Sequence, residues 1–570
     1  MNPLNQDQGI AMDYKIIKPN ISRSAVLAAS FLITSTALAQ TIPDAGQVLR
    51  ENERRVPVPA PSVKPSLTVP DEKDASANPG QVLAVQSVRL EGMSNISREE
   101  LQPFVAHLQD KQITLGDLRE SARKITLYYR ERGYVVARAF IPAQEINNDT
   151  VTIQILEGSL VSGRIENHSK VNERVLQSVL DAQDLNGKVI ASSTTDRGLL
   201  LLADIPAVGK VAGKLKPGEK VGTSDLIVSV DAGKSTEGNV SLDTYGNRYT
   251  GQNRLNGRIA FNSPTGLGDR LDLMATVTDE SLIYGRLAYD LPVHGDGLRI
   301  GAALSSSSYE LGQEFANLDA EGTAKTSGLY AVYPIVRGLN SNIWLTGNFE
   351  HRKLKDEVKS VASVVDKTAD AGTIELFGDL VDAYGGGGYS TWRVSGVFGD
   401  LSIDTPSARE IDSEGPRSNG QYKKLILSAS RLQAITEKTS LSFSLSGQWA
   451  SKNLDSSEKF LVGGIYAARS YPQGEGAGDE GWLGTVELRH QLHKSLQVAA
   501  FFDAGKVDLN HNPYIAGLTD VDLRSLGFNL TGGYGNILAK LTVAWHAGTD
   551  EATTAPDRDP RVWGSIGYNF

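Results

Sequence analysis

The segment LSFSLSGQW, residues 441–449, alternates apolar and small polar side chains. Leu441, Phe443 and Leu445 share one face of an extended chain, and serines occupy the other face. Successive side chains of a β-strand point to opposite sides, so such a strand would separate an apolar medium from a polar one. The last ten residues, RVWGSIGYNF, repeat the pattern. A weak period of two, without a long apolar run, is typical of membrane-spanning β-strands.

The same pattern fills the whole C-terminal part of the chain, residues 234–570. Sixteen segments there can be interpreted as strands separated by turn residues. A spacing of about 21 residues per strand and connection suits tilted membrane strands. An even number of antiparallel strands can close up-and-down and leave no free edge. We therefore predict a mainly β fold whose largest part is a 16-stranded antiparallel transmembrane β-barrel. A soluble propeller or sandwich is the alternative, but no blade repeat is found.

The N-terminus has the pattern of an export signal. Three basic residues precede the apolar run 25–33, and an A-x-A pattern ends at Ala39, before Gln40. We predict a signal peptide over residues 1–39, cleaved between Ala39 and Gln40, with Met12 as a candidate start. The mature chain would then be exported.

Composition and motif searches point away from catalysis and nucleic-acid binding. The chain has 570 residues, a formal net charge of −10 and no cysteine. Without cysteine there can be no disulfide, thiolate zinc site or cysteine nucleophile. No basic cluster suits nucleic acid. The eight histidines are scattered, and no G-x-S-x-G nucleophile motif is present. The glycine-rich GEGAGDEG (474–481) is acidic and would repel phosphate. We predict no catalytic residues, cofactor or metal site, so the protein is not expected to be an enzyme.

Residues 40–83 combine a short charged segment with a proline-rich one. Residues 44–55 suit a helix. Residues 56–79 contain VPVPAPSVKPSLTVP, which should be extended and semi-rigid. This region is predicted to be a small N-terminal element joined to the rest by a linker.

Two α+β patterns of similar size follow, at residues 84–158 and 159–233. In the first, helices are predicted over residues 97–108 and 113–133, with strands before and after them. The second again combines helical segments with strands. Similar neighbours in tandem indicate a repeated domain.

A lone arginine heads the loop in residues 460–489, FLVGGIYAARSYPQGEGAGDEGWLGTVELR. In LQVAAFFDAGKV (496–507), alternation puts Asp503 on the face opposite to Phe502. If Phe502 contacts lipid, Asp503 faces the lumen and needs a partner. Arg469, carried inward by the loop, could supply two parallel hydrogen bonds. The alternative is an exposed loop arginine in water.

These features together resemble one family, the outer-membrane transporters of two-partner secretion (the TpsB group, ShlB/FhaC/HecB-type haemolysin secretion/activation proteins). The resemblance covers the whole mature chain. It implies an N-terminal plug helix, two POTRA domains (84–158 and 159–233) and a barrel from residue 234. Four stretches carry it: PDAGQVLRENE (43–53), GYVVARAFIPAQ (133–144), RGLLLLADIPAVGKVAGKLKPGEKVGTSDLIVSVDAG (197–233) and GGIYAARSYPQGEGAGDEG (463–481).

The last of these stretches resembles the family's sixth-loop motif, in which V-R-G-Y or V-R-G-F heads a loop that folds into the lumen. Arg469 and Tyr471 match the motif, whereas Ala468 and Ser470 replace Val and Gly. The resemblance implies that Arg469 pairs with Asp503 on the barrel wall and tethers the loop.

The C-terminal residues Ile566, Tyr568 and Phe570 lie on one face and are similar to the signal by which the barrel assembly machinery recognises such proteins. The implied location is the outer membrane, in contact with its lipid, with the POTRA domains in the periplasm.

The resemblance implies a pore that secretes, and in some members activates, a large partner exoprotein such as a haemolysin or adhesin, which would dock on the POTRA domains. The alternative within the same superfamily is a barrel-assembly insertase. A nutrient porin or a barrel enzyme is a third candidate, which the POTRA-like domains and the missing Ser/His arrangement disfavour.

Overall fold

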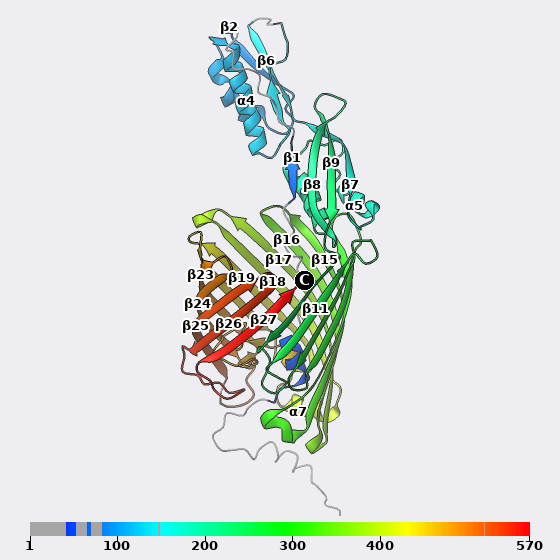
Figure 1. Ribbon diagram of the computed structural model, residues 1–570, viewed down its shortest axis with the longest axis vertical. Coiled ribbons are helices and arrows are strands. Elements are labelled where there is room, and N and C mark those ends of the chain that lie inside the picture. The colour runs from blue at the N-terminus through cyan, green and yellow to red at the C-terminus, as the bar shows by residue number, and fades with distance from the viewer. Residues whose placement is uncertain (1–41, 53–64, 70–81, 146–148, 518) are drawn as a thin grey trace, which may run out of the picture. The chain divides into compact units, whose positions relative to one another are not determined.

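The computed structural model describes residues 42–52, 65–69, 82–145, 149–517 and 519–570. The predicted signal peptide and cleavage site, Ala39–Gln40, lie outside the described residues. Most of the chain forms a closed barrel in which each strand pairs antiparallel with the next (Figure 1). The predicted 16-stranded barrel is confirmed. Its strands are β10 (Thr236–Asp243), β11 (Arg254–Asn262), β12 (Arg270–Thr278), β13 (Ile283–Pro292), β14 (Arg299–Glu310), β15 (Ala320–Arg337), β16 (Ser341–Val358), β17 (Ser363–Asp382), β18 (Gly388–Ile403), β19 (Gly420–Ala434), β20 (Thr439–Ala450), β23 (Glu480–His493), β24 (Leu496–Asp508), β25 (Asp520–Tyr534), β26 (Ile537–His546) and β27 (Arg561–Asn569).

The barrel wall is apolar outside and polar inside. In β20, Leu441, Phe443 and Leu445 are among the exposed large apolar side chains of the molecule. An apolar outer band is what lipid contact requires of a membrane barrel. Arginine–carboxylate pairs face the lumen: Arg254–Asp243, Arg258–Asp272, Arg270–Glu237, Arg299–Asp290 and Arg393–Glu375.

Three neighbouring strands are longer than the sequence pattern predicts. β15 and β16 have 18 residues each and β17 has 20. In their added parts the outer face is polar, as at Lys355 and Glu357, which pair at 3.0 Å. An alternation with apolar side chains outside disappears where the outer face is polar, so this pattern marks only the part of a strand that contacts lipid.

The first α+β domain contains a sheet in the order β3-β6-β5 (Ser87–Glu91, Thr150–Leu156 and Arg138–Phe140) and the helix α4 (Leu115–Glu131). β2 (Val82–Val85) pairs separately with β4 (Lys111–Thr114). The helix predicted over residues 97–108 is only partly right. Regular helix is limited to α3 (Arg98–Leu101), and two short 3-10 turns follow. Pro103 lies in the first of these turns, and a proline has no N–H to continue an α-helix.

The second α+β domain has a sheet in the order β1-β8-β9-β7. β7 (Ser159–Asn167), β8 (Val208–Pro217) and β9 (Thr223–Ala232) come from the domain itself, with the helices α5 (Glu173–Asp181) and α6 (Ser192–Ala203). β1 (Ser66–Thr68) comes from the proline-rich segment. The sequence predicts an extended chain there but not this pairing.

The short helix α2 (Ala45–Asn52) lies within the residues predicted to form the plug helix. Ala45, Val48 and Leu49 pack in one apolar cluster with barrel residues such as Tyr309 and Leu354. Among the described residues, no helix is long and apolar enough to cross a membrane.

Candidate functional site

The loop between β20 and β23 is packed inside the barrel. Phe460–Leu461 (β21) pairs with Ala477–Gly478 (β22) and closes the loop at its base. Ala468 and Tyr471 are fully buried, in one cluster with Val507 and Leu523 of the wall. The loop therefore forms a packed element of the lumen and is not an exposed connection.

Arg469 is held by two carboxylates of the wall. Its Nε donates to Asp503 Oδ2 at 3.0 Å and its Nη2 to Asp503 Oδ1 at 2.8 Å. Its Nη1 donates to Glu487 Oε2 at 2.8 Å. Arg469 is 6% exposed and Asp503 is not exposed. The alternative of an exposed arginine is wrong, and the structure brings together the two residues that the sequence singled out.

Other wall residues complete this arrangement. The guanidinium carbon of Arg469 lies 3.4 Å from the centre of the Phe501 ring, within cation–π distance. Thr485 donates to Asp503 at 3.0 Å, and Asn529 donates to Glu487 at 2.8 Å. Buried charges are tolerable when they are paired and fully hydrogen-bonded, as these are. Sequence analysis missed Glu487, although alternation in GWLGTVELRH places it opposite to the lipid-facing Val486 and Leu488.

The backbone around Arg469 is fixed as well. Trp563 Nε1 donates to the Arg469 carbonyl at 2.7 Å, and Arg561 Nε donates to the Ser470 carbonyl at 2.9 Å. Ser470 replaces the glycine of the motif without a positive φ, and its hydroxyl lies 2.7 Å from that of Ser525. The loop head therefore needs no glycine here.

Tyr471 occupies the next position of the loop. Its ring stacks on His546 with centroids 4.4 Å apart, and its hydroxyl donates to the Asp550 carbonyl at 2.8 Å. The inward side of the wall from β23 to β27 therefore surrounds Arg469, Ser470 and Tyr471 together.

The acids of GEGAGDEG are also occupied. Glu475 accepts from the backbone N–H of Thr553 and Thr554, each at 2.9 Å, and from both hydroxyls. Asp479 accepts from Lys459 at 2.6 Å. The acidic residues of this glycine-rich loop therefore bind other parts of the protein, and no phosphate ligand is needed to explain them.

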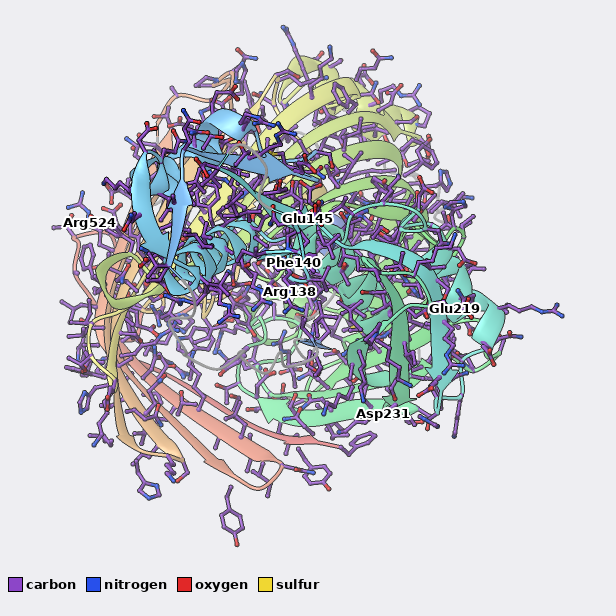
Figure 2. The ribbon with its side chains drawn as sticks, turned by 90° about the horizontal axis from the view of Figure 1, so that it is seen from above. Arg138, Phe140, Glu145, Glu219, Asp231 and Arg524 are labelled. Atoms are coloured by element: carbon purple, nitrogen blue, oxygen red, sulfur yellow. The ribbon has the colours of Figure 1, made fainter. Side chains whose placement is uncertain are left out.

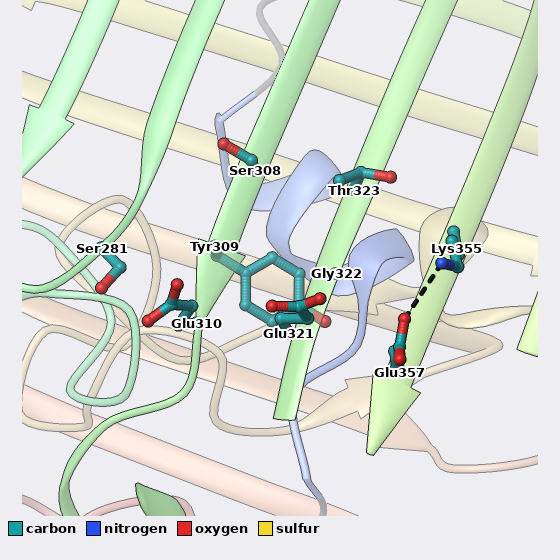
Figure 3. Close-up of a pocket in the computed structure, with 9 residues that line it drawn as sticks. All are labelled: Ser281, Ser308, Tyr309, Glu310, Glu321, Gly322, Thr323, Lys355 and Glu357. Atoms are coloured by element: carbon teal, nitrogen blue, oxygen red, sulfur yellow. Dashed lines mark hydrogen bonds and ion pairs between the residues drawn. The ribbon is translucent and has the colours of Figure 1, made fainter. Parts of the chain in front are cut away.

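The helix α2 also makes polar contacts with the wall and the loop at its start. Asp44 accepts from Ser456 Oγ at 2.6 Å and from Lys367 Nζ at 3.2 Å. The backbone N–H of Ala45 donates to Asp356 Oδ1 at 2.7 Å. Tyr309, which lies on the α2 side of the β14 strand in Figure 3, donates to the same Asp356 oxygen at 2.7 Å.

The helix and the inward loop also contact each other. A Cβ placed on Gly46 would lie 2.4 Å from Ser456 Oγ and 2.8 Å from the backbone nitrogen of Ser457. Asn247 joins the two elements by donating to Glu51 at 3.3 Å and to the Gln473 carbonyl at 3.2 Å. Because Gly46 has no side chain, the helix can lie this close to Ser456 and Ser457 of the loop.

The predicted C-terminal signal lies on the outside of the barrel. Ile566, Tyr568 and Phe570 are all exposed. Backbone hydrogen bonds in both directions join Phe570 to Gly238 of β10 and close the wall. The structure gives these residues a lipid-facing position, and their role as a recognition signal stays a prediction.

A family model for haemolysin secretion/activation proteins of the ShlB/FhaC/HecB type matches residues 222–523, which is more than half of the chain. The chain belongs to this family. The ShlB-type POTRA model matches residues 83–158. Haemolysin secretion/activation proteins of this family are outer-membrane transporters with POTRA domains in the periplasm, and this location applies here.

Several relatives are similar over most of the chain. The heme/hemopexin transporter protein HuxB of Haemophilus influenzae (strain 86-028NP) is 28% identical, over 85% of this chain and 86% of its own. The outer membrane transporter CdiB of Escherichia coli O6:K15:H31 is 23% identical, over 79% and 75%. The structure of a CdiB from Escherichia coli has the same fold, with a TM-score of 0.68, 20% identity and coverage of 88% and 93%.

Proposed function

We propose that this protein secretes one large partner exoprotein through its lumen, which α2 and the inward loop close at rest. Membership of a transporter family favours this function over barrel assembly. One observation carries the mechanism: two separate elements fill the lumen, and they are held with different strength.

The inward loop is the permanent element. The Arg469 side chain makes charged contacts to β23 and β24, and the peptide group between Arg469 and Ser470 contacts β25 and β27. Separating a buried arginine from its carboxylates is costly, because each charge would then be buried without a partner. We infer that Arg469 and Asp503, with Tyr471, tether the loop to the wall while the pore works.

The helix α2 is the removable element. It has only eight residues, and it is held by hydrogen bonds near Asp44 and Ala45 and by the packing of Val48 and Leu49. Water can replace the hydrogen bonds at a net cost of about 1 kcal/mol each. An isolated helix this short is also unstable in water, so its seat in the barrel is what keeps it folded. Its departure would open the lumen.

The partner is an exported exoprotein that docks on the POTRA domains before transit. HuxB is similar over 85% of this chain, so a partner that handles haem or hemopexin is the first to test. A haemolysin or a contact-dependent toxin is the next candidate, from the similarity to the hemolysin transporter protein ShlB of Serratia marcescens and to CdiB. Activation of the partner during transit is a separate step of this proposal.

The test is secretion of the candidate exoprotein encoded beside this gene, scored in the culture medium with and without this protein. We expect the exoprotein outside only when the protein is present. An exoprotein trapped in the periplasm in both strains, with lowered levels of other outer-membrane barrels in the deletion strain, would support the insertase instead.

A further inference from the structure

The strand β1 occupies the edge of the second POTRA sheet. It pairs parallel with β8, so that Ser66 lies opposite Ala212, Leu67 opposite Gly213 and Thr68 opposite Lys214. Figure 1 shows β1 beside β8, although β1 comes from the segment that precedes both POTRA domains in the sequence. The chain thus adds one of its own segments to a strand edge, the mode by which sheets capture extended peptides.

The edge offers a fitted seat for an apolar side chain. Leu67 and Val69 pack against the apolar core of the domain. A Cβ on Gly213 would lie 3.0 Å from Leu67 Cδ1 and 3.2 Å from Leu199 Cδ1. The missing side chain at Gly213 therefore makes the space that Leu67 fills. Ser66 and Thr68 point away from the core, so the edge accepts apolar residues at alternate positions.

The outer face of the same edge is cationic. Lys210, Lys214 and Lys216 are all exposed on β8. Lys216 lies opposite Asp225 of β9, but Lys214 lies opposite Ile227 and, among the described residues, has no ion-pair partner. Its neighbour on β1 is Thr68, which is uncharged. An acidic residue in that position would be a better cross-strand partner for Lys214.

β1 uses only part of this edge. Three of its residues pair, whereas β8 has ten. β5, an edge strand of the first POTRA sheet that carries Arg138 and Phe140 (Figure 2), has only three residues. A longer strand could thus make more backbone hydrogen bonds with β8 than β1 does.

We propose that the β8 edge is the docking site for an extended segment of the exported partner, with apolar residues at alternate positions and an acidic residue facing Lys214, and that β1 is an internal competitor which this segment displaces. The proposal rests on the proposed function. Because β1 is tethered, its effective concentration at the edge is of the order of millimolar, so only a longer or better-paired segment displaces it.

The test locks β1 in place. The native chain has no cysteine, so Ser66→Cys with Ala212→Cys would create a single cross-link between directly opposed residues. We expect at least a tenfold fall of the exoprotein in the medium under oxidising conditions and recovery on reduction. The control is Glu166→Cys with Ser229→Cys, which joins β7 to its permanent neighbour β9 away from the β8 edge and should leave secretion unchanged.

Comparing oxidised with reduced cells distinguishes an effect of the cross-link on docking from an effect of the substitutions on folding, because the polypeptide is identical in both states. Normal secretion by the fully oxidised Ser66–Ala212 pair would overturn this inference and leave the proposed function intact. Absence of secretion by the wild-type protein would instead overturn the proposed function.

A binding measurement gives a second, independent readout. The probes are the peptides PSLEV and PSLKV, added to the purified full-length protein with Leu67→Asp to weaken β1. We expect PSLEV to bind at least tenfold more tightly than PSLKV, and Lys214→Ala to abolish the difference. Equal binding of both peptides would overturn the assigned charge preference.

Discussion

Arg469 is the residue on which the inward loop depends most. Arg469→Ala would leave Asp503 buried without its cation, which costs about 3–5 kcal/mol. We expect loss of most secretion from a barrel that is still inserted, measured in the medium and by heat-modifiable migration of the folded barrel. Arg469→Lys should also fail, because lysine cannot make the same forked contact. Arg489→Ala is the control, since Arg489 also pairs with Glu487 but is about a third exposed.

A reversed pair tests the contact itself. Arg469→Asp combined with Asp503→Arg restores opposite charges at the same two positions, and partial recovery of secretion is expected. Normal secretion by Arg469→Ala alone would show that the loop needs no tether.

Glu157 makes the stability of the first POTRA domain depend on pH. Its carboxylate accepts from the backbone N–H of Ser94 and Asn95 at 2.8 and 2.9 Å and from Tyr129 at 2.9 Å. Burial alone would raise the pKa of Glu157, but these bonds to the ionised form outweigh it and lower the pKa to about 2. The pKa in the unfolded chain is higher, near 4.5. The stabilisation is therefore complete above about pH 4.5 and is lost as the pH falls towards 2.

The expected loss is about 3 kcal/mol, at 1.36 kcal/mol per pKa unit. Hydrogen exchange of residues 84–158 in the full-length protein, measured as protection relative to the unfolded chain at the same pH, should show less protection as the pH falls from 4.5 to 3, and Glu157→Gln should already be less protected at pH 7. Glu166→Gln, at an exposed position, is the control. Identical exchange by Glu157→Gln and the wild type at pH 7 would show that these bonds stabilise little.

At the residue scale, sequence reasoning located Arg469 and Asp503 because one belongs to a motif and the other to an alternating strand. It missed Glu487, on the strand that follows the loop, and Trp563 and Arg561, which contact the loop head from the last strand of the barrel. Trp563 and Arg561 donate hydrogen bonds to backbone carbonyls of the loop. A backbone carbonyl leaves no mark in a sequence, so such partners become visible only in three dimensions.

At the scale of elements, α2 should control conductance. Gly46→Val would place a side chain against Ser456 and the backbone of Ser457, where a Cβ alone is already too close. We expect a larger open fraction in planar-bilayer recordings, as with deletion of residues 43–55, and normal barrel insertion. Gln47→Ala, which removes a contact within the helix to Glu51, is the control. Conductance unchanged by the deletion would rule out a plug.

The barrel strands were predictable from the sequence where one face of the strand contacts lipid and the other contacts water. All sixteen barrel strands follow from period two, but the ends of β15, β16 and β17 do not, because their outer face is polar there. The pairing of β1 was not predictable. Only Leu67 and Val69 distinguish it from the rest of a proline-rich segment, and the glycine that receives Leu67 lies far along the chain.

At the scale of the whole molecule, the route of the partner distinguishes a transporter from an insertase. Templating another barrel requires a free strand edge, and a closed barrel has none unless one seam opens. The pairing of β10 with β27 is the shortest in the wall, with five residue pairs. Passage through the lumen, by contrast, leaves every seam closed.

A cross-link at this seam therefore tests the route. Leu242 and Ile566 lie opposite each other on the lipid-facing side, and Leu242→Cys with Ile566→Cys would lock β10 to β27. We expect the oxidised protein to secrete its partner as well as the reduced protein does, because a chain moving through the lumen crosses no strand pair. Leu255→Cys with Val277→Cys, which locks β11 to β12, is the matched control. Secretion lost only with the β10–β27 lock would mean that the barrel opens sideways, and the lumen route would be wrong.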